Sequence, residues 1–333
     1  MKKNRIFLSF ILIVALCLGL TGCGSLNMGS KQEKADSITD AAMSCLNAMK
    51  MGDFEKASSY MEEGNEMLHV FAAMNGESVP EMDKAYQAFC KQMAELEFTI
   101  EEEDERLPGF IYIKVKNRDY GSSIYASMRN ALENQAKNGG NAYTEIGDWL
   151  EEGITSAEMG EEEETKADFA AKNHGYYLQH GGYPDVAFMN ALTGGFYDFA
   201  DATMTVCTYE EEGYTLRYDI ASIGDNIISY LKTTGIDESF VDTSAVEQYK
   251  QEQEELCNML AGFYGSVYTE NGMVYTTVGI DFTKADQNTL VQAGIVSGAY
   301  NTSFGDYLSL SSTISGFEKD GMTCVTTPQY DEE

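Results

Sequence analysis

Apolar residues recur along this chain with two periods, one typical of helices and one typical of strands. Residues 36–51, 80–96 and 120–132 carry apolar side chains at i, i+3 and i+4, which predicts amphipathic helices. Residues 111–115 instead alternate between apolar and polar side chains, which predicts a half-buried strand. Ser37 precedes the first helix as a capping residue, so this boundary is also marked locally.

The last third of the chain predicts a meander of strands. Three alternating segments, 204–209, 214–220 and 226–231, are separated by turns that contain glycine. Further on, Asn271-Gly272 joins two apolar-alternating segments. This dipeptide predicts a tight β-hairpin, because both of its residues tolerate positive φ.

A helix is predicted between the meander and the hairpin. Ser244 and Glu247 form an S-x-x-E capping box at its start, and it extends to about Leu260. Its inward face is expected to consist of Val246, Tyr249, Leu256, Cys257 and Leu260.

The chain begins with a short segment that contains basic residues, and an apolar run follows it. The run covers residues 6–20, and at about fifteen residues it has the length of a signal-peptide core. A membrane-spanning helix needs about 20 residues. We therefore interpret the run as an export signal that is removed.

The last residue of this run and the three residues that follow it resemble the lipobox of bacterial lipoproteins. They read Leu20-Thr21-Gly22-Cys23, an aliphatic residue and two small residues before the cysteine. The resemblance implies cleavage before Cys23 and attachment of lipid to it. We expect a protein held by this lipid on the outer face of the bacterial cytoplasmic membrane, since two or more acyl chains give stable anchoring.

The composition excludes some classes of partner. The chain carries 54 acidic residues against 22 basic ones, a net charge of −32. Binding to a phosphate backbone needs clustered lysine and arginine, so no nucleic-acid partner is expected. The acidity also disfavours docking on anionic lipid headgroups. Its simplest role is to keep an exported protein soluble.

The cysteines leave the disulfide pairing open. Beyond the signal segment and Cys23 there are five of them, at Cys45, Cys90, Cys207, Cys257 and Cys324. An odd number leaves at least one thiol free. No two have C-x-x-C spacing, and Cys45–Cys90 is one pairing that the sequence allows.

The C-terminal part, from about residue 203 to 327, resembles the YehR family of small bacterial lipoproteins. The resemblance lies in the segment Val278-Gly279-Ile280-Asp281-Phe282-Thr283-Lys284-Ala285-Asp286, in Leu290, and in a terminal helix followed by a strand. It implies an antiparallel sheet with helices. It carries over no active site, because the family has no established enzymatic residues.

The N-terminal part resembles the nuclear-transport-factor-2-like or cystatin-like domains of Gram-positive lipoproteins. The resemblance lies in segments 51–57, 115–121 and 190–195. It implies a curved antiparallel sheet around a helix, with a hollow that binds a ligand in some members and is packed core in others. The strands expected between 160 and 185 are not evident in the sequence.

These patterns together predict an α+β protein with two domains, each an antiparallel sheet packed against helices. Residues 1–22 are the signal peptide and 23–35 a flexible lipidated tether without apolar periodicity. Residues 36–200 form the first domain and 203–333 the YehR-like domain. The sequence leaves the oligomeric state open.

Catalytic and metal motifs are missing from the sequence. It contains no G-x-S-x-G elbow, phosphate-binding loop or H-E-x-x-H. His174 and His180 come nearest to a metal site, but their six-residue spacing fits no known zinc motif, and we expect loop histidines. No cofactor is expected either.

We therefore expect non-catalytic binding or structural work at the cell surface, on an extracellular protein or a small ligand. One alternative is a carrier with a pocket in the N-terminal domain. Another is a hydrolase with an unrecognised acidic site.

Overall fold

The chain forms two compact units. Each contains an antiparallel sheet and helices, which confirms the predicted α+β class. The computed structural model describes residues 35–62, 80–103, 109–172, 175–178, 183–199, 202–292 and 308–327. Unit 1 comprises Met1–Tyr120 and Ala157–Tyr197, and unit 2 comprises Gly121–Ser156 and Asp198–Glu333. The signal segment lies outside the described residues, as does the tether up to residue 34.

The two units do not follow the predicted division at about residue 200. Residues 121–156 were assigned to the N-terminal domain, but they group with the C-terminal residues. The ranges 36–200 and 203–333 therefore need correction, because each compact unit is built from two separate stretches of chain.

Unit 1 is an antiparallel sheet with helices packed against it. The strand order is β1-β2-β3-β4, and every pairing is antiparallel. The strands are Glu97–Glu103, Phe110–Lys116, Glu163–Lys172 and Gly175–Leu178. The helices are α2 (Ile38–Lys50), α3 (Phe54–Ser58), α5 (Asp83–Gln92) and α8 (Tyr183–Thr193). Strands β3 and β4 are the strands expected between residues 160 and 185.

Local caps start the first two helices. The Ser37 side chain accepts a hydrogen bond from the Asp40 backbone N–H at 3.1 Å, which confirms the predicted cap of α2. The Asp53 carboxylate accepts one from Lys56 N–H at 3.0 Å before α3. Each bond satisfies a backbone donor that the first turn of a helix leaves without a partner.

Aromatic side chains fill the interior of unit 1. Phe89 lies at its centre, with ring centroids 5.9 Å from Phe54, 5.3 Å from Tyr120 and 4.6 Å from Phe196. All four side chains are buried. Among the described residues of unit 1, these rings form packed core, and the expected N-terminal pocket stays a prediction.

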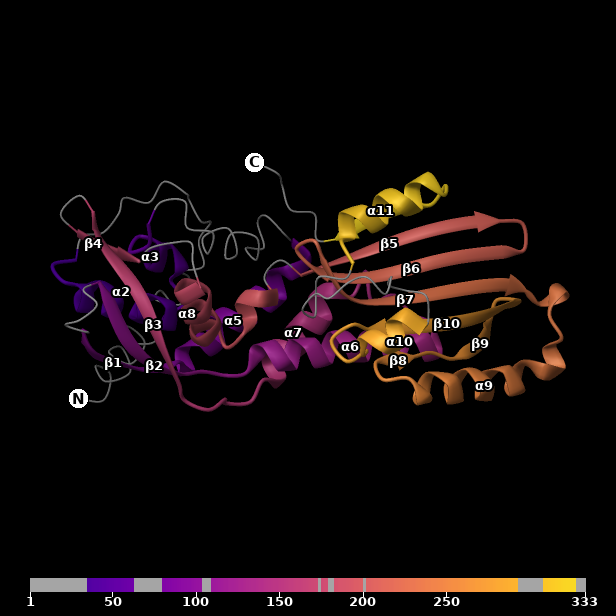
Figure 1. Cartoon of the computed structure of the whole chain (residues 1–333), viewed down its shortest axis with the longest axis horizontal. Coiled ribbons are helices and arrows are strands. Elements are labelled where there is room, and N and C mark those ends of the chain that lie inside the picture. The colour runs from indigo at the N-terminus through magenta and orange to yellow at the C-terminus, as the bar shows by residue number, and fades with distance from the viewer. Residues whose placement is uncertain are drawn as a thin grey trace, which may run out of the picture. The chain divides into compact units, whose positions relative to one another are not determined.

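Unit 2 contains a seven-stranded antiparallel sheet (Figure 1). Its order is β11-β5-β6-β7-β10-β8, with β9 also pairing with β10. The strands are β5 (Ala202–Glu211), β6 (Tyr214–Ile223), β7 (Asn226–Asp237), β8 (Phe263–Tyr264), β9 (Val267–Glu270), β10 (Met273–Asp281) and β11 (Thr323–Thr327). The helices are α6 (Tyr120–Asn138), α7 (Ile146–Ser156), α9 (Val246–Met259), α10 (Gln287–Gln292) and α11 (Leu310–Lys319). The predicted meander and its terminal strand are confirmed.

The β9–β10 hairpin turns as predicted at Asn271-Gly272. Asn271 has φ 50° and Gly272 has φ 78°. These are the positive angles that a two-residue hairpin turn requires, and Asn and Gly adopt them at low cost.

Helices cover the two faces of this sheet differently. On one face Ile220 and Phe282 belong to an apolar core with Leu290 of α10 and Ile314 of α11. The neighbouring residue Asp219 points to the opposite face, where it bonds to α6. We call the first of these the α11 face and the second the α6 face.

A disulfide fastens the edge strand β11 to β5. It joins Cys207 to Cys324, which lie opposite each other in the register. Cys45, Cys90 and Cys257 form no disulfide, in line with the odd cysteine number. Burial raises the pKa of the Cys45 thiol to about 12, so this group is inert at neutral pH.

Candidate binding site

The site residues proposed from sequence lie outside the part of the chain that the structure describes. This holds for the lipobox Leu20, Thr21 and Gly22, for the lipidation site Cys23, and for the histidines His174 and His180. Their assignments stay predictions. Among the described residues, no group of three or more His, Cys, Asp or Glu side chains could hold a metal ion. No described helix has both the length and the apolar character needed to cross a membrane.

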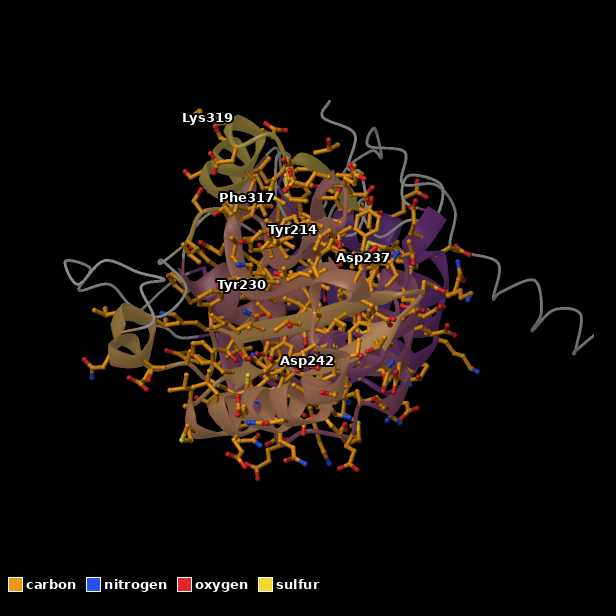
Figure 2. The ribbon with its side chains drawn as sticks, turned by 90° about the vertical axis from the view of Figure 1, so that its right-hand side faces the viewer. Tyr214, Tyr230, Asp237, Asp242, Phe317 and Lys319 are labelled. Atoms are coloured by element: carbon orange, nitrogen blue, oxygen red, sulfur yellow. A yellow bond between two sulfur atoms is a disulfide. The ribbon has the colours of Figure 1, made fainter. Side chains whose placement is uncertain are left out.

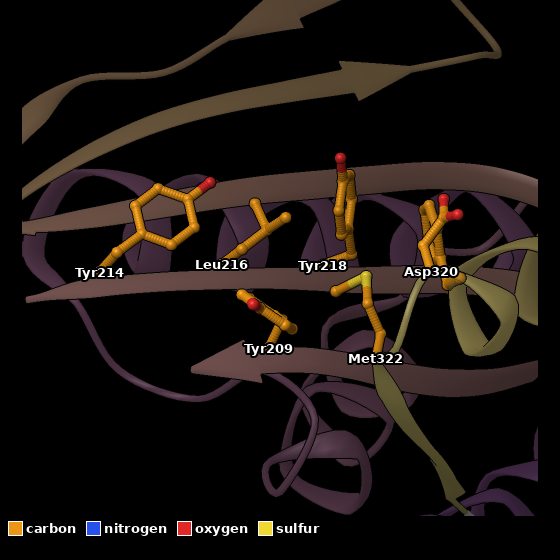
Figure 3. A pocket seen from close by; sticks show the side chains of 7 residues that line it. Tyr209, Tyr214, Leu216, Tyr218, Asp320 and Met322 are labelled. Atoms are coloured by element: carbon orange, nitrogen blue, oxygen red, sulfur yellow. The ribbon is translucent and has the colours of Figure 1, made fainter. Parts of the chain in front are cut away.

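An aromatic pocket opens on the α11 face of unit 2 (Figure 3). Its volume is about 310 Å³, and we call it the aromatic pocket. The lining residues come from β5, β6, α11 and the segment that follows α11. They are Tyr209, Tyr214, Leu216, Tyr218, Phe317, Asp320 and Met322.

The alternation of β6 builds the floor of this pocket. Tyr214, Leu216 and Tyr218 are two residues apart, so they share one face of the strand, and Figure 3 shows them in a row. Tyr209 of β5 pairs with Leu216 and extends the row sideways. All four side chains are partly exposed.

Helix α11 forms one wall of the pocket. Phe317 stacks on Tyr218 with ring centroids 4.4 Å apart and planes at 26° (Figure 2 shows Phe317 on α11). Partial burial raises the pKa of Tyr218. Asp320, directly after α11, is the one charged side chain among the described lining residues. The pocket is therefore largely aromatic, with a carboxylate in its lining.

A second depression lies between α9 and the sheet. Its volume is about 410 Å³, and we call it the α9 groove. It is lined by Ile236, Val241, Tyr249, Glu252, Gln253, Leu256, Val267, Val274 and Thr276. Tyr249 is 43% exposed and Leu256 is 49% exposed, so the predicted inward face of this helix is wrong for both residues. Cys257, predicted to face inward, is buried.

Strand pairing makes the two depressions neighbours on one face. Tyr214 lies opposite Ile236, which lies opposite Val274. Directly paired residues of antiparallel strands lie on the same side of a sheet. One cross-strand row therefore connects the aromatic pocket with the α9 groove.

The α6 face carries a buried carboxylate at the end of β10. Asp281 is 1% exposed and pairs with the guanidinium of Arg129 on α6. Its other oxygen accepts bonds from the Tyr125 hydroxyl and from Thr283, whose Oγ1 lies at 2.6 Å. Every oxygen of this carboxylate is engaged, so the group fastens α6 to the sheet.

A second buried carboxylate lies on the same face. Asp219 accepts bonds from Arg217 Nη2 at 2.5 Å and from Gln135 Nε2 at 2.7 Å. Burial raises its pKa, and Arg217 and Gln135 oppose that effect. Among the described residues the buried acids are Asp219 and Asp281, and each is paired with an arginine. Neither has the free carboxylate that acid–base catalysis requires.

Other aromatic side chains of the protein are not available for ligand contact. Trp149 is 3% exposed and donates to the Ala142 carbonyl at 3.3 Å, and Tyr177 is also buried. Both belong to the core. The tyrosines of β5 and β6 form an exposed aromatic surface instead, and their two-residue spacing was the signal in the sequence.

Comparisons with known proteins add little to this picture. No protein-family model matches the chain. No curated protein matches it significantly. The NMR structure of a protein from Streptococcus pneumoniae TIGR4 matches with a TM-score of 0.27 and 18% identity, covering 37% of this chain and 84% of that chain.

The NMR structure of the E. coli YehR protein matches with a TM-score of 0.26 and 13% identity, covering 38% of this chain and 93% of that chain. It bears the name of the family that the C-terminal sequence resembles. A likeness with so low a TM-score carries no argument about function, so the function has to be argued from this chain's own residues.

Proposed function

We propose that this chain is a lipid-anchored binding protein on the outer face of the bacterial cytoplasmic membrane, with a non-catalytic role. The lipid anchor is supported by the lipobox-like Leu20-Thr21-Gly22-Cys23 after a short apolar run. The binding role is supported by the aromatic pocket.

The observation that carries the binding role is the row of half-exposed aromatic rings on β6. A sheet normally buries large aromatic side chains on one face and presents polar residues on the other. Here Tyr214 and Tyr218 lie on the face of the apolar core, and the strands of the sheet continue beyond α11 (Figure 1). Aromatic rings held by a rigid sheet suit ligand contact, since little side-chain entropy is lost on binding.

The anchor is tested by replacing its cysteine. Cys23→Ala should abolish lipid attachment, and mass spectrometry of the membrane fraction should then find no diacylated mature form. The matched control is Cys90→Ala, which removes a different thiol outside the lipobox-like motif. If Cys23→Ala cells still contain the lipidated mature protein, the anchor assignment is wrong.

The binding role is tested by thermal unfolding against a panel of amino acids, amines, sugars, peptidoglycan fragments and lipids. A ligand present at about 100 times its dissociation constant adds about 2.7 kcal/mol to the free energy of unfolding. We expect a shift that Tyr214→Leu removes and that Tyr249→Leu on α9 leaves unchanged. A panel without any shift would count against small-ligand binding.

The carrier alternative is also better supported in unit 2 than in unit 1. The rings around Phe89 are packed core in the described part of unit 1, whereas the aromatic pocket offers about 310 Å³ in unit 2. The same panel separates the two placements, because a ligand bound in unit 1 would be insensitive to Tyr214→Leu.

A further inference from the structure

We propose that the aromatic pocket binds a small organic cation of the substituted-ammonium class. This inference rests on the proposed binding function and specifies the chemistry of its ligand. Four aromatic rings and one carboxylate are the recognition elements, contributed by Tyr209, Tyr214, Tyr218, Phe317 and Asp320.

The rings supply the attraction. The face of an aromatic ring is electron-rich, and it attracts a cation that lies within about 6 Å of the ring centroid. One such contact exists in the protein itself, because Lys232 Nζ lies 5.9 Å from the centroid of Tyr218. The other rings of the pocket, Tyr209 and Tyr214, are partly exposed. Several rings that line one depression are the kind of surface that recognises quaternary ammonium groups.

The carboxylates near the pocket have the sign that a cation requires, and Lys232 beside Tyr218 is the opposing charge. Asp320 belongs to the lining, and the Tyr209 hydroxyl donates to Glu211 at 3.1 Å. This bond raises the pKa of Tyr209. The turn between Tyr209 and Tyr214 contains three glutamates, of which Glu211 lies beside Tyr209 and Glu210 points to the α6 face. These carboxylates would repel an anionic ligand.

The size and lining of the pocket favour this class over sugars. About 310 Å³ lies at the small end of ligand pockets, which range from about 300 to 1,000 Å³. A sugar ring also needs several hydrogen-bonding groups in its plane. The hydrogen-bonding groups of the lining are three tyrosine hydroxyls and the Asp320 carboxylate. Leu216, Met322 and Phe317 offer none, and a methylated ammonium group presents apolar methyls to such a surface.

The test compares two ligands that differ in charge alone. Choline carries a trimethylammonium group, and 3,3-dimethylbutan-1-ol carries a neutral tert-butyl group of the same shape. Both are titrated by calorimetry into the full chain, purified in a neutral detergent. We expect choline to bind at least about tenfold more tightly than the alcohol, because the cation–aromatic attraction is lost with the charge.

Two variants and two matched controls locate the effect. Tyr214→Leu and Asp320→Asn should each weaken choline binding by about fivefold or more. Tyr249→Leu and Glu318→Gln change a tyrosine and an acid outside the pocket, and both should leave choline binding as it was.

The outcomes separate the ligand class from the binding function. Equal binding of choline and the alcohol, lost in Tyr214→Leu, would overturn the cation inference and leave a neutral apolar binding site. Binding of neither ligand would also overturn the cation inference, and the wider ligand panel would then decide whether the pocket binds at all. Choline binding that Asp320→Asn and Tyr214→Leu leave intact would place the cation elsewhere.

Discussion

The disulfide between Cys207 and Cys324 should be a main support of unit 2. The bond closes a loop of chain with a sequence separation of 117. The entropy lost by an unfolded chain on closing a loop of this length corresponds to about 4.8 kcal/mol, and removing a native disulfide typically costs about 2–5 kcal/mol. We therefore expect the double variant Cys207→Ala, Cys324→Ala to lose about 2–5 kcal/mol of unfolding free energy in unit 2.

The single tryptophan makes this loss measurable in one unit. Trp149 is the chain's one tryptophan, it is buried, and it belongs to unit 2. Its fluorescence during urea unfolding therefore reports on unit 2 without a contribution from unit 1. Reductant should destabilise the wild-type chain as the double substitution does, and it should leave the double variant unchanged. A loss below about 1 kcal/mol at an unchanged urea dependence would refute the reasoning.

Four further substitutions test the packing and charges of unit 2 with the same tryptophan signal. Gly153→Ala should cost about 1–3 kcal/mol, because an added Cβ would lie 2.4 Å from the α6 backbone, whereas Gly316→Ala on α11 meets no atom within 4 Å and should stabilise by up to about 1 kcal/mol. Equal effects of these two would contradict the packing argument. Asp281→Asn should cost about 3 kcal/mol, because it leaves a guanidinium without its buried partner, and a neutral result would mean that water replaces the carboxylate. Burial raises the pKa of Tyr230 to about 12, above the value of about 10 in an unfolded chain. The contribution of the neutral Tyr230 hydroxyl to the free energy of unfolding is therefore complete below about pH 10, and it is lost as the pH rises to about 12. Tyr230→Phe should flatten this alkaline loss, and an unchanged slope would assign it to other groups.

Features set by neighbouring residues could be predicted from the sequence. The Asn271-Gly272 turn and the Ser37 cap depend on a few adjacent backbone groups, and both were predicted correctly. Even so, the capping box predicted before α9 is wrong. Asp242 accepts the Ser244 N–H at 3.0 Å in a short turn, and α9 begins at Val246 without a side-chain cap.

Features set by distant residues could not be predicted. The period of α9 marks an apolar stripe with Tyr249 and Leu256, but burial of that stripe depends on how much sheet lies beneath it, and here it lines an open groove. Strand β3 could not be predicted because its buried residues include the small Ala167 besides Phe169, and the hydrophobicity along the strand therefore alternates little. The rings of the aromatic pocket come from β5, β6 and α11, which only the fold brings together.

The placement of residues 121–156 in unit 2 has a consequence for how the protein matures. If the chain is exported as we propose, it crosses the membrane with its N-terminus first, so α6 and α7 emerge well before the strands that they pack against. Arg129 and Gln135 can pair with Asp281 and Asp219 only after the later part of the chain has been synthesised. During this interval the helix pair is exposed to proteases and to other exported chains. Assembly of unit 2 is thus a late event, and a secretion intermediate halted near residue 200 should be a natural target for quality control at the membrane.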